Sequence, residues 1–183
     1  LGKFKDAEKA TRKAIELKPK IFNSHFLLGN ILHAQSRIKD AEISIRKAIE
    51  LKPDFAEAHC NLGSVLKSIG QLEEAELSTK KAIELKPNFS MAYLNYGAIL
   101  KELGKFEESH MAYKEALKLS PNDLVSNIQS RLAFSDIVAD EDQIDRERSN
   151  YLNQISEIEN NKKLKLNGNP LFSTNIFYLA YHN

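Results

Sequence analysis

The sequence predicts an all-α solenoid of antiparallel helix pairs, repeated every 34 residues. The first observation is a recurring segment, since AIELKPK at residues 14–20 returns as AIELKPD at 48–54 and as AIELKPN at 82–88. The second is a ladder of structure-breaking residues at the same interval: Pro19, Pro53, Pro87 and Pro121, together with Gly29, Gly63 and Gly97. A fixed period of this length is the signature of stacked repeats. The third is composition, because Trp is absent and Leu, Ile, Ala, Lys and Glu dominate, as is typical of helices.

Each repeat is predicted to hold two helices, and residues 56–69 and 72–85 are the clearest example. Small residues at Gly63, Ala75 and Ala82 allow the two helix axes to approach closely, because a larger side chain would hold them apart. One helix pair of this size cannot bury its apolar face alone. Neighbouring pairs must therefore stack on one another.

The helix ends are marked by residue type. Gly70 and Gly104 are predicted to adopt the positive φ that ends a first helix, with Ser36 in the equivalent place. Pro87 ends a second helix, because its nitrogen carries no hydrogen for a helical hydrogen bond. The following first helix needs an N-cap, and three residues with capping side chains stand in that place: Asp54, Asn88 and Asn122.

We expect six segments along the chain. A partial repeat with a second helix alone occupies residues 1–21, and complete repeats follow at 22–55, 56–89 and 90–123. Residues 124–160 are predicted to form degenerate capping helices, since Arg131 takes the place of the ladder glycine. Residues 161–183 are interpreted as a linker and the start of a following segment. The start at Leu1, inside a repeat, is interpreted as a fragment boundary in a longer array.

A Leu-Gly pair marks the first helix of each complete repeat, as Leu28-Gly29 and Leu62-Gly63, with Tyr96-Gly97 in the third copy. A small residue follows twelve positions after each glycine, and a proline ends each unit. Over residues 1–122 this pattern resembles the tetratricopeptide-repeat family. The family's usual Trp is replaced by His25, His59 and Tyr93. The resemblance implies a right-handed superhelix whose first helices line a concave groove that binds a protein or peptide.

A narrower resemblance concerns the repeat sequences AEAHCNLGSVLKSIGQLEEA and MAYLNYGAILKELGKFEES, which are similar to those of O-GlcNAc transferase and SPINDLY-like proteins. Asn61 and Asn95 match an asparagine ladder of that family, although Leu27 interrupts it. NPLFSTNIFYLAYHN, at residues 169–183, is similar to the segment that joins repeats to the glycosyltransferase domain in SPINDLY-like proteins. The alternative function is therefore the substrate-recognition arm of a larger O-glycosyltransferase, with no catalytic residue in this chain.

The groove residues form rows that repeat every 34 residues. Asparagine amides there can hydrogen-bond the backbone of an extended peptide, and lysines can attract its carboxylates. We favour peptide binding over simple solvation for Asn61 and Asn95, while both interpretations fit Lys67 and Lys101 equally. The other candidate binding residues are His33, Asn30, Ser64, Phe26 and Leu94. A chaperone-adaptor role is disfavoured, because positions of the basic clamp that holds acidic chaperone tails carry Phe26, Glu57, Cys60, Met91 and Leu94.

No sequence motif predicts catalysis, a cofactor or a metal site. His25 and His59 fit helix packing better than metal binding, and Cys60 fits a small buried residue better than a reactive thiol. The charge balance of 26 Lys and Arg against 25 Asp and Glu gives no reason to expect nucleic acid or an anionic membrane as partner.

Two further expectations concern the setting of the chain. A single cysteine excludes an internal disulfide and indicates a reducing compartment, so we expect a cytoplasmic protein. Self-association through the open end of the solenoid ranks below the other functions. That end would expose an apolar stripe made of Phe4, Ala7, Ala14 and Leu17.

Overall fold

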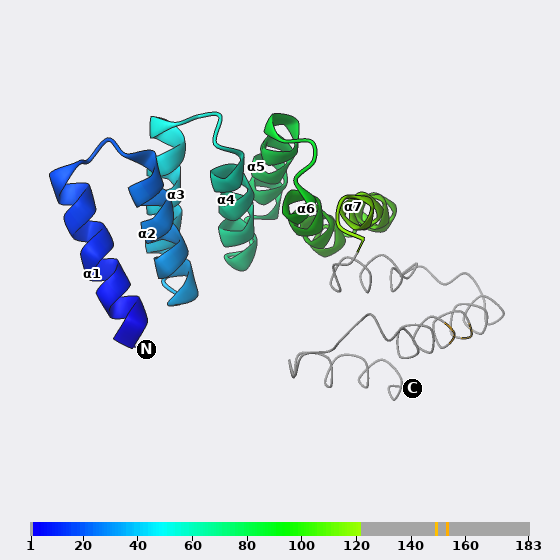
Figure 1. Cartoon of the computed structure of the whole chain (residues 1–183). Helices are drawn as coiled ribbons and strands as arrows, with labels where there is room; N and C mark the ends of the chain where they lie inside the picture. The colour runs from blue at the N-terminus through cyan, green and yellow to red at the C-terminus, as the bar shows by residue number, and fades with distance from the viewer. Residues whose placement is uncertain (1, 122–148, 150–152, 154–183) are drawn as a thin grey trace. The chain divides into compact units, whose positions relative to one another are not determined.

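The computed structural model describes residues 2–121, together with Ser149 and Asn153. Within residues 2–121 every regular element is a helix, which confirms the predicted all-α repeat fold (Figure 1). The helices are α1 (Gly2–Leu17), α2 (Phe22–Ala34), α3 (Ile38–Leu51), α4 (Ala56–Ser68), α5 (Leu72–Leu85), α6 (Ser90–Glu102) and α7 (Phe106–Leu119). They belong to the first of two compact units, Leu1–Ala139 and Asp140–Asn183. The capping helices and linker predicted for 124–183 lie outside the described residues.

The helices form antiparallel pairs that stack in chain order. α2 packs most extensively on α3, α4 on α5 and α6 on α7, and each pair contacts the next through α3 and α4 or α5 and α6. The first helices also contact one another directly, α2 with α4 and α4 with α6. The repeats therefore lie closest together on the side of α2, α4 and α6, where side chains of successive repeats can meet.

Within each pair, a glycine of the first helix removes the side chain that would separate the two helices. A Cβ atom at Gly29 would overlap the side chain of Ile45, and one at Gly97 would lie 2.7–2.9 Å from the Tyr113 ring. At Gly63 a Cβ would overlap the Thr79 hydroxyl and lie 3.1 Å from the Ala75 carbonyl oxygen. The facing second helices carry fully buried alanines, such as Ala41, Ala48, Ala75, Ala82 and Ala116. Close helix contact is thus built into every repeat.

The prolines end the second helices as predicted. α3 and α5 stop two residues before Pro53 and Pro87, and the intervening Lys52 and Lys86 are extended, with φ near −144° and −143°. The proline ring clashes with a preceding residue in helical conformation, so that residue leaves the helix. The helix end is therefore set one residue earlier than the missing N–H alone requires.

The predicted N-caps at Asp54 and Asn88 are wrong. α4 and α6 begin one residue later than capping by these side chains would need, with Phe55 and Phe89 at the N-cap positions and no side-chain cap hydrogen bond. The backbone closes the turn by itself, because the Phe55 N–H donates to the Lys52 carbonyl (3.2 Å). The third predicted cap, Asn122, lies outside the described residues.

An aromatic contact between repeats explains why a phenylalanine takes the N-cap position. The Phe55 ring lies 5.0 Å from that of Phe22 and 4.8 Å from that of Phe26, in edge-to-face geometry. Aromatic pairs of this kind contribute about 0.5–1.5 kcal/mol beyond the burial of their area. The N-cap residue is therefore used for packing against the preceding repeat.

Two histidines tie a first helix to the turn that precedes it. His25 Nε2 donates to the Pro19 carbonyl oxygen (2.8 Å), and His59 Nε2 donates to the Pro53 carbonyl oxygen (2.9 Å). A carbonyl oxygen can only accept, so Nε2 carries the proton in both rings. Both histidines therefore have a structural role in helix packing.

The close approach at Gly63 predicts a large effect for a single added methyl group. Gly63→Ala should lower the free energy of unfolding by about 1–3 kcal/mol, because the new Cβ forces α4 and α5 apart. Urea unfolding followed by circular dichroism measures this. Ser64→Ala, on the next and half-buried residue, is the matched control and should stay within about 0.5 kcal/mol of the original. Equal stability of the two variants would contradict this packing.

The turns between first and second helices predict one stabilising change. Ser36 has φ 60°, where the equivalent Gly70 and Gly104 have φ 76° and 74°. A side chain costs energy in this left-handed conformation, so Ser36→Gly should raise the free energy of unfolding by about 0.5–1 kcal/mol. Ser36→Ala keeps a Cβ and should change stability little. Thermal or urea unfolding of both variants separates backbone strain from loss of the hydroxyl group, and stabilisation by alanine would contradict the strain.

Candidate functional site

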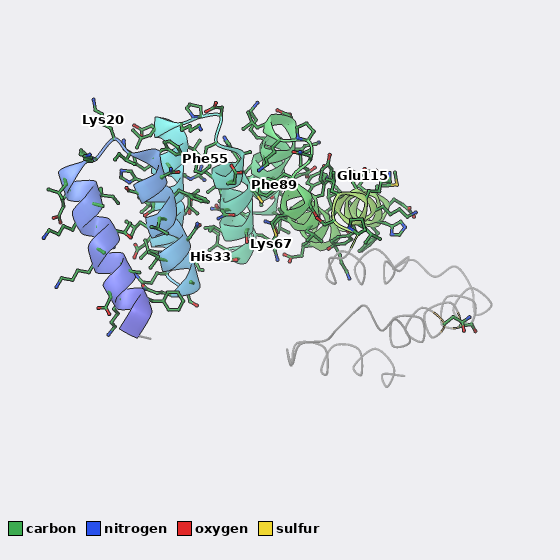
Figure 2. The ribbon with its side chains drawn as sticks, in the orientation of Figure 1. Lys20, His33, Phe55, Lys67, Phe89 and Glu115 are labelled. Atoms are coloured by element: carbon green, nitrogen blue, oxygen red, sulfur yellow. The ribbon has the colours of Figure 1, made fainter. Side chains whose placement is uncertain are left out.

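The candidate site is the surface that α2, α4 and α6 share, which we call the first-helix face. Its rows come from equivalent positions in successive repeats, as the 34-residue period predicts. Figure 2 shows His33 and Lys67 at corresponding ends of α2 and α4. Contacts between repeats cross this face, and they decide which polar groups a partner could still use.

The best-defined polar contact on the face joins Asn30 and Asn61. The Asn61 amide nitrogen donates to the Asn30 side-chain oxygen over 2.8 Å, and both residues are half-buried. This bond uses one donor of Asn61 and one lone pair of Asn30. Each side-chain amide has two N–H donors and an oxygen acceptor, so the pair keeps three N–H groups and the Asn61 oxygen for other partners. The structure thus brings these two predicted residues together as one polar group.

Asn95 occupies the equivalent position to Asn61 but has different partners. Its amide nitrogen lies 3.3 Å from Cys60 Sγ and 3.5 Å from the Cys60 carbonyl oxygen. Cys60 is fully buried, and burial raises the pKa of its thiol to about 12. A raised pKa keeps the thiol protonated at neutral pH, so the sulfur is a weak hydrogen-bond acceptor and a poor nucleophile. Asn95 is therefore held to α4 and does not repeat the Asn30–Asn61 arrangement.

The predicted cationic row lies in the last turns of the first helices, with His33 on α2, Lys67 on α4 and Lys101 on α6. The negative end of a helix dipole favours positive charge at this place, which gives the row a stabilising role without a ligand. Lys67 also forms an ion pair with Glu102 of α6 (2.8 Å). The charge of Lys67 is thus largely compensated, while Lys101 is exposed.

Sequence reasoning missed Glu102 as part of the face. It lies 35 residues after Lys67, one position beyond the repeat interval, so the rows did not pair the two residues. The contact arises because α4 and α6 lie side by side with a small offset. A search for opposite charges one residue off the repeat period could have found this ion pair.

The apolar part of the face differs from the prediction. Phe26 packs edge-to-face on Phe55 and is half-buried, so it belongs largely to the contact between repeats. Leu94 is half-buried as well. Two residues that were not predicted to bind are the more exposed ones, Leu27 at 51% and Met91 at 53%. Their signal in the sequence is an apolar residue in a row that carries polar or charged residues elsewhere.

The edge of the face at the helix N-termini combines aromatic rings with lysines. Lys86 forms an ion pair with Glu57 (2.8 Å) and lies 4.8 Å from the centre of the Phe89 ring. Lys52 lies 4.8 Å from the centre of the Phe22 ring. A cation over a ring face is attracted by the electron-rich π system. These lysines therefore brace neighbouring repeats.

Within residues 2–121, no group of three or more His, Cys, Asp or Glu side chains is arranged to hold a metal ion. None of the described helices is long and apolar enough to cross a membrane. Ser64, the remaining predicted residue of the face, is half-buried on α4.

Three sequence models described as tetratricopeptide repeat match the chain, at residues 1–56, 56–89 and 79–111. Together these matches span more than half of the chain, and they coincide with the stacked helix pairs. The chain belongs to the tetratricopeptide-repeat family. A comparison with curated proteins found no significant match.

Solved structures of similar fold support this assignment for the tetratricopeptide repeats described above. A crystal structure of MamA has a TM-score of 0.73 at 22% identity, covering 87% of this chain and 91% of MamA. Pseudomonas aeruginosa pilF gives 0.69 at 21% identity, covering 85% of this chain and 69% of pilF. The first tetratricopeptide-repeat domain of Spaghetti (RPAP3), bound to the HSP90 peptide SRMEEVD, gives 0.59 at 23% identity, covering 61% and 88%. Identities this low establish the fold of the repeats.

The environment of Cys60 predicts a protected thiol in the folded tetratricopeptide repeats. Because burial raises its pKa to about 12, little thiolate exists in weakly alkaline buffer. Alkylation by iodoacetamide should therefore be at least about a hundredfold slower in the folded chain than in denaturing urea. Mass spectrometry follows the reaction without ambiguity, because Cys60 is the chain's one cysteine. Similar rates in both states would contradict its burial in the α4–α6 contact.

Proposed function

We propose that this chain is a protein-interaction module that binds an extended peptide along the first-helix face. The observation that carries the proposal is the Asn30–Asn61 pair, which bridges two repeats and keeps hydrogen-bonding groups for a further partner. Backbone N–H and C=O groups of an extended peptide are complementary to such amides, whatever the peptide's side chains. Asn95 would be a weaker contributor, since its amide nitrogen already faces Cys60.

The spacing of the repeats suits an extended ligand. Packed helices lie about 8–10 Å apart, and an extended chain rises about 3.3 Å per residue. One repeat therefore corresponds to about three peptide residues, and equivalent side chains of neighbouring helices can reach backbone groups at that interval. An α-helical ligand, with its backbone groups already hydrogen bonded, would leave the asparagine amides without partners.

Side-chain preference would come from Leu27 and Met91. Both are about half exposed on the first-helix face, on α2 and α6, to either side of the central helix α4. Burying apolar surface contributes about 25 cal/mol per Å². A partner with apolar side chains some six residues apart would cover both residues, given about three peptide residues per repeat.

The charges of the face favour such a peptide over a strongly acidic tail. Lys67 is compensated by Glu102, and Glu57 adds a carboxylate at the other edge, where it is paired with Lys86. The Spaghetti (RPAP3) domain shows that this fold can hold a peptide with acidic residues, SRMEEVD. In the present chain Phe26 and Met91 stand where a basic clamp would need cations, so we expect a different ligand class.

The test is a selection from a random peptide library displayed on phage, followed by calorimetric titration of the best binder. Asn30→Ala combined with Asn61→Ala should weaken binding about tenfold or more, since two hydrogen bonds of about 1 kcal/mol each are lost. Leu27→Ala should weaken it as well. Leu77→Ala, at a similarly exposed leucine of α5, is the control and should leave the dissociation constant unchanged. Unchanged affinity in the double variant would contradict the proposal.

The alternative function is the substrate-recognition arm of a larger SPINDLY-like O-glycosyltransferase. It rests on the resemblance of the repeat sequences and of residues 169–183. A full-length transcript that encodes a glycosyltransferase domain after Asn183 would support this alternative, and a stop codon there would remove it. The first-helix face would bind the acceptor protein in that case, so the peptide test applies to both functions.

A further inference from the structure

The second helices carry an exposed apolar row that the peptide-binding proposal does not use. Ile43 on α3, Leu77 on α5 and Met111 on α7 are 34 residues apart and are 68%, 69% and 58% exposed. Each lies on the helix side opposite the buried alanines, such as Ala75 and Ala82 on α5. We call these three residues the outer stripe. In α1 the equivalent position holds Lys9, so the stripe begins at α3.

Charged residues flank the stripe in a fixed order along each helix. On α5, Glu73 and Glu74 precede Leu77 by one turn, and Lys80 and Lys81 follow it by one turn. Residues three and four positions apart share one face of a helix, so the order across this face is acidic, apolar, basic. All four charged residues are exposed. A surface with this order is complementary to an antiparallel copy of itself.

We propose that the outer stripe is the contact between two copies of this chain, centred on α5 and related by a two-fold axis along the row of helices. The axis reverses the direction of each helix but keeps the order of the repeats. Each apolar residue of the stripe then meets its own copy, and Glu73 and Glu74 face Lys80 and Lys81 of the second copy. An isologous contact of this kind needs a self-complementary patch, which α5 supplies.

The outer helices support this arrangement in part and oppose it little. Asp40 would face Lys47 of the copy on α3, and Glu107 would face Lys114 of the copy on α7. Two like-charge pairs also result, and in each of them one partner is already compensated within its own chain. Arg46 is paired with Glu42 (2.8 Å) and Glu74 (2.7 Å), and Glu115 is paired with Lys118.

The size of the face sets the strength of the contact. Each of the three helices has 14 residues and is about 21 Å long at 1.5 Å per residue, so the face covers on the order of several hundred Å². Standard stable interfaces bury roughly 800 Å² per partner. The dimer is therefore weak and concentration-dependent, and added salt weakens it further because its ion pairs are exposed.

Analytical ultracentrifugation of the full chain over a wide concentration range tests this proposal. The original chain should show a reversible monomer–dimer equilibrium. Leu77→Lys, which introduces the residue type found at position 9, should raise the dimer dissociation constant at least tenfold. Leu17→Lys is the matched control, because Leu17 is 74% exposed but lies on α1, away from the stripe. It should leave the equilibrium unchanged.

Charge reversal tests the antiparallel register. Glu73→Lys alone and Lys80→Glu alone should each weaken the dimer, and the two substitutions together should restore it. A chain that stays monomeric at every concentration overturns the proposal. So does a dimer that is lost in Leu17→Lys but kept in Leu77→Lys, since that result assigns association to the open end of the solenoid near Phe4 and Leu17.

Discussion

The close contact between the two helices of each repeat is the constraint on which the rest of the structure depends. At Gly29, Gly63 and Gly97 the second helix leaves no space for a Cβ atom, and it offers buried alanines in return. A larger residue on either side would splay the pair and alter the stacking of the next one. Since every repeat uses the same contact, the first helices align on one side, and equivalent residues fall into rows.

This alignment gives the molecule two surfaces of different character. On the first-helix face, side chains of neighbouring repeats reach one another, as the Asn30–Asn61 and Lys67–Glu102 contacts demonstrate. On the other side, α3, α5 and α7 carry the outer stripe and its flanking charges. The same 34-residue period therefore supports both proposals, one for an extended peptide and one for a second copy of the chain. The two surfaces use different helices, so one chain could make both contacts.

Much of the fold could be predicted from the sequence, because its determinants are local and repeat. Glycine and proline have few conformational equivalents, so Gly70 and Gly104 marked turns and Pro53 and Pro87 marked helix ends correctly. The N-caps at Asp54 and Asn88 failed, because aromatic packing by Phe55 competed with side-chain capping. The residues of the first-helix face were placed in rows by the period alone. Their partners could not be predicted, since the contacts of Asn95 with Cys60 and of Lys67 with Glu102 depend on the offset between stacked helices.

The central claim is that a peptide binds the first-helix face through its asparagine amides. The most direct measurement is a ¹⁵N nuclear magnetic resonance titration of the chain with a selected peptide, observing the side-chain NH₂ signals of asparagine. The account predicts that the signals of Asn30 and Asn61 shift with added peptide, while backbone signals around Leu77 on α5 stay in place. Shifts confined to α3, α5 and α7, with the Asn30 and Asn61 signals unmoved, would contradict it.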